Sequence, residues 1–101
     1  MSRVVVIHEV GGPEVLKLEA RGPLTPAPGQ VVIRNEAIGL NFIDVYQRSG
    51  LYPLPLPLTP GGEGAGTVSA VGEGVTGLGV GDRVLYASGG AYADEIVAAA
   101  D

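Results

Sequence analysis

The chain has 101 residues, enough for one domain with a modest core but too few for two. It has no cysteine, which excludes disulfides and thiolate metal sites, and its one histidine disfavours an imidazole metal site. A net charge of −5, with the charges scattered, argues against a nucleic-acid partner. The apolar run at the N-terminus is too short for a signal sequence or a membrane span, so we expect a cytoplasmic protein.

The first 40 residues predict three strands. Residues 3–9 and 15–19 are rich in β-branched or alternating apolar side chains, and we expect a strand pair joined by a tight connection. Three prolines make residues 21–29 a surface connection. Residues 30–40 alternate well enough for one long strand, provided that it bends near Asn35.

The next segment, residues 41–50, changes to helical spacing, which predicts a short helix. Asn41 can cap its start and Gly50 can end it. Four prolines between residues 53 and 60 then predict an extended, stiff loop. Since no stretch has the length of a major helix, the predicted fold is mainly β.

Three further strands are predicted at residues 64–72, 82–87 and 91–100, separated from one another by glycines. The predicted architecture therefore has about six strands, with one short helix between the third and the fourth. His8 falls at the end of the first strand, with no carboxylate expected to act with it, and we interpret it as an ordinary strand-end residue.

The glycines at positions 72, 74 and 77 stand in the G-x-G-x-x-G order of a dinucleotide-binding turn. Such a turn binds pyrophosphate because a helix N-terminus follows it and points free amides at the ligand. Here the chain continues as LGVGDRV, in which the glycines disfavour a helix and a strand follows at once. We therefore interpret these glycines as part of a hairpin connection.

Four segments together are typical of one family: HEVGGPEVLKLE (8–19), AIGLNFIDVYQRSGLYP (37–53), PGGEGAGTVSAVGEGV (60–75) and GDRV (81–84). They resemble the N-terminal, GroES-like catalytic domain of the medium-chain dehydrogenase/reductase superfamily, in particular its zinc-free quinone oxidoreductases of the ζ-crystallin type. The resemblance implies a partly open β-barrel, incomplete at its C-terminus. Family members are considerably longer, so residues 1–101 are expected to be the N-terminal part of the catalytic domain, without the nucleotide-binding Rossmann domain.

The resemblance also implies a zinc-free reaction. Zinc-dependent members of the superfamily carry a cysteine where this chain has Asn41 and a histidine where it has Gly62. Loss of zinc removes the Lewis acid that activates an alcohol. The family instead implies hydride transfer from NADPH to a quinone or another conjugated carbonyl, with NADPH bound mainly by the absent domain. We expect the full-length protein to be a homodimer and the isolated chain to be inactive.

By the same resemblance, amide and phenol side chains would stabilise charge that develops on the substrate oxygen. The candidate catalytic residues are Asn41, Tyr46 and Tyr52. Three charged residues would line the cleft that faces substrate and cofactor: Asp44, Arg48 and Glu63.

Each candidate also has a structural interpretation. Asn41 could serve only as a helix cap, and Tyr46 could pack in the core. Arg48 could pair with the carboxylate four residues before it. Tyr52 could anchor the proline-rich loop, and Glu63 could be a structural hydrogen-bond acceptor.

Two other functions remain open. One is a zinc-free enoyl reductase of the same superfamily, which shares the L-N-F string. The other is a non-enzymatic GroES-like binding or co-chaperonin module, in which the polar residues of NFIDVY (41–46) would have no chemical use.

Overall fold

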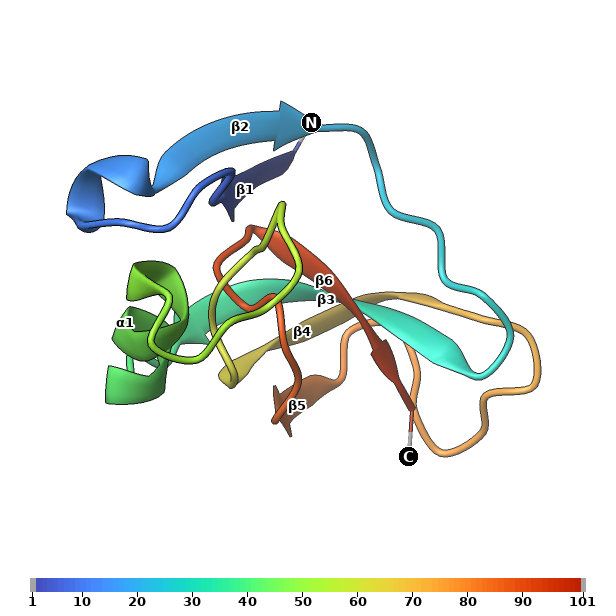
Figure 1. Cartoon of the computed structure of the whole chain (residues 1–101). Coiled ribbons are helices and arrows are strands. Elements are labelled where there is room, and N and C mark those ends of the chain that lie inside the picture. Colours follow the sequence, from blue (N-terminus) through green and yellow to red (C-terminus); the bar gives the residue numbers. More distant parts are fainter. Residues whose placement is uncertain (1, 101) are drawn as a thin grey trace.

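The computed structural model describes residues 2–100, and it is mainly β with one α-helix (Figure 1). Its elements are β1 (Ser2–Val6), the 3-10 helix η1 (Pro13–Val15), β2 (Lys17–Arg21), β3 (Gln30–Ile38), α1 (Phe42–Ser49), β4 (Gly64–Val71), β5 (Arg83–Tyr86) and β6 (Glu95–Ala99). The strands and the place of α1 after the third strand confirm the predicted fold class. No helix in this part of the chain is long and apolar enough to cross a membrane.

The strands form two antiparallel sheets. β1 pairs with β2, and the larger sheet has the order β5-β4-β3-β6. The register between β3 and β4 shifts between Asn35 and Ala37. This irregularity confirms the bend that the sequence predicts near Asn35, because a shift in register kinks the strand.

The sequence suggested a tight connection between β1 and β2, and this prediction is wrong. The connection runs over residues 7–16 and contains η1. The reason is that Ile7 pairs with Leu58 instead of turning back toward β2. The Ile7 N–H donates to the Leu58 carbonyl at 2.7 Å, and the Leu58 N–H donates to the Ile7 carbonyl at 2.9 Å. The proline-rich loop is thereby fixed to the end of β1.

His8 has a carboxylate partner that the sequence did not suggest. Its Nε2 lies 2.6 Å from the Glu19 Oε2 atom, and both side chains are largely exposed. In the antiparallel pairing of β1 with β2, Glu19 lies opposite Val4, four residues before His8. An exposed pair of this kind contributes only about 0–1 kcal/mol.

The core is formed mainly by the larger sheet, and β1 contributes to it from the hairpin, which lies over one side of the sheet in Figure 1. Val4 of β1 is clustered with Val31 and Ile33 of β3, Val68 of β4 and Ile96 of β6. Full burial of a side chain of this size contributes about 1.5–3 kcal/mol. Helix α1 lies at one end of this sheet (Figure 1).

The glycine fingerprint lies in the connection from β4 to β5. β5 pairs antiparallel with β4, and among residues 2–100 no helix follows these glycines. The Gly72 N–H donates to the Gln30 carbonyl at 2.7 Å, and a Cβ at position 72 would collide with the Ala27 carbonyl. The interpretation as a hairpin connection is therefore confirmed.

Candidate active site

Helix α1 presents apolar side chains to the outside. Phe42, Ile43 and Val45 are 80%, 46% and 40% exposed, whereas the one buried residue within α1 is Asp44, at 5%. A surface helix normally buries its apolar stripe and exposes its charges. An outward apolar face of this kind is typical of a surface that binds a ligand or another domain.

The buried Asp44 carboxylate organises the first turn of α1. Its Oδ2 atom accepts a hydrogen bond from the Asn41 backbone N–H at 3.0 Å and another from the Tyr92 hydroxyl at 2.9 Å. A negative charge in the first turn also interacts favourably with the helix dipole. Asn41 is the cap residue, as predicted, and Gly50 ends the helix with φ = 89°.

Tyr92 is a stable hydrogen-bond donor to this carboxylate. Burial raises the pKa of Tyr92 to about 12, and the hydrogen bond to Asp44 acts in the same direction. The hydroxyl therefore stays protonated over the whole physiological pH range.

The Asn41 side chain is directed to Glu63. Its Nδ2 atom donates to the Glu63 Oε1 atom at 3.3 Å, and the Gly39 N–H donates to the Glu63 carbonyl at 3.1 Å. Two of the six predicted residues are thus in contact, and both side chains are exposed. This amide and carboxylate lack the cysteine and histidine ligands typical of zinc, and residues 2–100 contain no group of three or more His, Cys, Asp or Glu that could hold a metal.

Tyr46 and Tyr52 form a second pair. Their ring centroids are 5.5 Å apart with an interplanar angle of 85°, and the Tyr52 N–H donates to the Tyr46 carbonyl at 3.2 Å. Edge-to-face aromatic pairs of this kind hold both rings in place. Tyr46 is 36% exposed and Tyr52 51%, so the suggestion that Tyr46 packs in the core is wrong. Both hydroxyl groups belong to residues at the surface.

Arg48 has a different partner from the one that helical spacing suggests. Its Nε atom donates to the Gly11 carbonyl at 3.2 Å, and the Gly11 N–H donates to the Arg48 carbonyl at 3.0 Å. Among the described residues it forms no ion pair with Asp44, which already accepts from Asn41 and Tyr92. Arg48 therefore ties the end of α1 to the β1–β2 connection.

A cavity of about 440 Å³ opens beside α1. Its size suits a small-molecule ligand. Part of its wall is made of two glycine pairs, at positions 61–62 and 89–90, which leave the backbone accessible at close range. The side chains that line it are Ile43, Asp44, Gln47, Leu54, Leu58 and Thr59.

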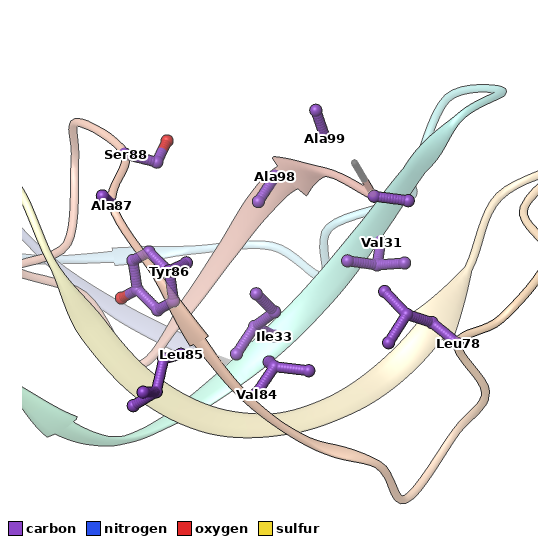
Figure 2. Close-up of a pocket in the computed structure, with 11 residues that line it drawn as sticks. Val31, Ile33, Leu78, Val84, Leu85, Tyr86, Ala87, Ser88, Ala98 and Ala99 are labelled. Atoms are coloured by element: carbon purple, nitrogen blue, oxygen red, sulfur yellow. The ribbon is translucent and has the colours of Figure 1, made fainter.

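A second cavity, of about 460 Å³, lies between the edge strands β5 and β6 (Figure 2). Val31, Ile33 and Leu78 contribute to its wall, and its polar side chains are Tyr86 and Ser88. It contains none of the six predicted site residues and no charged side chain. The cavity beside α1 is lined by one of the six, Asp44, and the candidate catalytic residues Asn41, Tyr46 and Tyr52 lie outside its lining.

Two residues that organise this region were missed by the sequence analysis. One is Tyr92; the other is Asn35, whose Nδ2 atom donates to the carbonyls of Ala91 and Ala93 at 3.1 and 2.8 Å. The Asn35 Oδ1 atom accepts from the Tyr86 hydroxyl at 2.6 Å, and burial raises the pKa of Tyr86. The sequence offered one signal for each residue: Asn35 is an amide within an apolar strand, and Tyr92 is a single tyrosine among small residues.

Residues 27–100 match the family described as the alcohol dehydrogenase GroES-like domain. The quinone oxidoreductase of Pseudomonas aeruginosa is 55% identical over 97 residues, which cover 93% of this chain and 30% of that protein. The 2-haloacrylate reductase of a Burkholderia species is 44% identical over 102 residues, with 94% of this chain and 30% of that protein covered.

Among solved structures, Escherichia coli quinone oxidoreductase complexed with NADPH superimposes with a TM-score of 0.92 at 48% identity, over 97% of this chain and 31% of that one. The chain spans 30% of the length of the curated relatives named above. The resemblance to quinone oxidoreductases that the sequence predicts is confirmed over this span. The chain belongs to the family of alcohol dehydrogenase GroES-like domains.

Proposed function

We propose that this chain forms the substrate side of an NADPH-dependent oxidoreductase that reduces quinones or other conjugated carbonyl compounds. The observation that carries the proposal is the outward face of α1 and the loop after it, where the amide of Asn41 and the phenols of Tyr46 and Tyr52 accompany exposed apolar side chains. A flat, apolar acceptor with polar oxygens matches such a surface. The similarity to quinone oxidoreductases, one of them solved with NADPH, supports it.

When bound, NADPH would supply the hydride. The role of this chain would be to position the acceptor and to donate a hydrogen bond to its oxygen as negative charge develops there. Asn41 can donate through its amide and the two tyrosines through their hydroxyls, all without a change in protonation of the side chain. Exposed Phe42 would pack against the ring of the acceptor and exclude water from it.

The charged candidates have supporting roles in this proposal. Asp44 fixes the start of α1, Arg48 fixes its end, and Glu63 orients the Asn41 amide. The reaction would use no zinc, because Asn41 and Gly62 stand at the positions where zinc-dependent members of the superfamily carry ligands. Most contacts to NADPH would come from sequence that the longer relatives have beyond the matched span. The complete enzyme would be a cytoplasmic homodimer, and residues 1–101 alone would be inactive.

A chimera tests the proposal. Residues 1–101 replace the matching segment of the Pseudomonas aeruginosa quinone oxidoreductase, and NADPH oxidation is followed with a quinone, a 2-haloacrylate and an enoyl thioester as acceptors. We expect turnover of the quinone, and a loss of roughly a hundredfold in kcat in Asn41→Ala and in Tyr52→Phe, because each variant removes a donor to the acceptor oxygen. Leu85→Ala is the control, because this 85% exposed side chain lies on β5 in the other cavity.

The same assay separates the alternatives. A preference for 2-haloacrylate would assign the chain to reductases of conjugated acids. The similarity to the Burkholderia enzyme is the reason for including this acceptor. A preference for the thioester would indicate an enoyl reductase. A chimera that binds NADPH and reduces none of the three acceptors would overturn the proposed function.

A further inference from the structure

We propose that Tyr92 is a positioning residue for the Asn41 amide, acting through the buried Asp44 carboxylate. This inference rests on the proposed function for its catalytic consequence, but its structural basis is independent of it. Tyr92 lies in the loop between β5 and β6, outside the segments on which the candidate site is built.

The Tyr92 hydroxyl is held in place from the backbone outward. The Tyr92 N–H donates to the Pro60 carbonyl at 2.9 Å, and the Val5 N–H donates to the Tyr92 carbonyl at 2.9 Å. A Cβ at Gly61 would lie 2.7 Å from the Tyr92 Cδ1 atom, so the ring packs directly on the backbone there. The hydroxyl therefore projects from a fixed frame made by β1 and residues 60–61.

The hydroxyl determines where the Asp44 carboxylate lies. One oxygen, Oδ2, accepts both from Tyr92 and from the Asn41 backbone N–H. Asp44 is only 5% exposed, so water has little access to replace either donor. Fixing this oxygen fixes the peptide N–H of Asn41, and with it the direction in which the Asn41 side chain leaves the helix.

The same tyrosine also positions the partner of that side chain. The Asn41 amide donates to Glu63, which lies three residues after Pro60 along the chain, and Pro60 accepts the Tyr92 N–H. The Tyr92 backbone and hydroxyl thus hold the two sides of the Asn41–Glu63 contact in register. If the ring served only for packing, phenylalanine would replace it without effect on Asn41.

The first test uses the 101-residue chain and needs no activity. In Tyr92→Phe, we expect the hydrogen-exchange rate of the Asn41 backbone amide, measured by NMR, to rise about tenfold or more. Tyr86→Phe is the matched control, because it removes a tyrosine hydroxyl that serves Asn35 instead, and it should leave Asn41 exchange unchanged. Unchanged exchange in Tyr92→Phe would overturn the proposal. If that variant does not fold, p-aminophenylalanine at position 92 keeps the shape but is a weaker donor, and an unchanged Asn41 exchange rate in it would likewise overturn the proposal.

The second test uses the chimera described above. Tyr92→Phe should lower kcat by roughly tenfold to a hundredfold with little change in the KM for NADPH. In an Asn41→Ala background it should have no further effect, because Tyr92 acts only through Asn41. A loss of kcat that persists in that background would overturn the positioning role. A chimera inactive toward every acceptor would refute the proposed function and leave the exchange experiment to decide the role of Tyr92.

Discussion

The Asn35 side chain joins β3, β5 and the loop before β6, so its replacement should be costly. Asn35→Ala removes two donated hydrogen bonds, to the carbonyls of Ala91 and Ala93, and one accepted from Tyr86. Each such bond contributes about 0.5–1.5 kcal/mol net, which gives a predicted loss of roughly 2–4 kcal/mol in the free energy of unfolding. Ala91 and Ala93 are 0% and 7% exposed, so water compensates poorly at this site.

Urea unfolding followed by circular dichroism measures this loss. Tyr86→Phe removes one of the three bonds and should cost about 1 kcal/mol, and the double variant should cost less than the sum of the two, because they share a bond. Arg34→Ala is the neighbouring control on β3, with an exposed side chain, and should stay within about 0.5 kcal/mol. If Asn35→Ala costs no more than Arg34→Ala, the assignment of Asn35 as a structural centre is refuted.

Three further predictions concern the connection between β4 and β5, alkaline pH and the open sheet edges. Gly72→Ala should lower the free energy of unfolding by about 1–3 kcal/mol, because its Cβ would collide with the Ala27 carbonyl. Gly79→Ala is the control and should be neutral within about 0.5 kcal/mol, because the space around its Cβ is open. Equal urea midpoints for the two variants would contradict this prediction. The pKa of Tyr92 is raised from 10.0 to about 12, so its stabilising contribution is complete below pH 10 and is lost as the pH rises through 12. In urea unfolding between pH 8 and 12, the free energy of unfolding should fall less in Tyr92→Phe than in the unsubstituted chain. An identical fall in both would contradict the raised pKa of Tyr92. The outer edges of β5 and β6 have no partner strand among residues 2–100, so the isolated chain should self-associate; sedimentation as a monomer at all concentrations would be the contrary result.

The order of the elements was predictable because local signals determine it. β-branched runs bounded by glycines indicate strands, and the chemistry of Asn41 and Gly50 marks the two ends of α1. The resemblance to quinone oxidoreductases also rested on contiguous strings of residues. Prediction from sequence was therefore reliable for the type and order of the elements, for which the evidence lies within about ten residues along the chain.

The contacts of the candidate site were not predictable in this way. Helical spacing showed which side chains of α1 share a face but not which face is covered, so the burial of Asp44 came only from the structure. Its partner Tyr92 is 48 residues away, and the partners of Asn35 are 51 to 58 residues away. The suggested Arg48–Asp44 pair failed for the same reason, since distant residues compete successfully for both side chains.

Single-turnover hydride transfer in the chimera, at saturating NADPH and quinone, tests the proposed role of α1. We expect the chimera to reduce the quinone and Asn41→Ala to slow the step by roughly a hundredfold, while Leu85→Ala leaves it unchanged. Equal rates of hydride transfer with and without the Asn41 amide would show that this face of α1 does not stabilise the substrate oxygen.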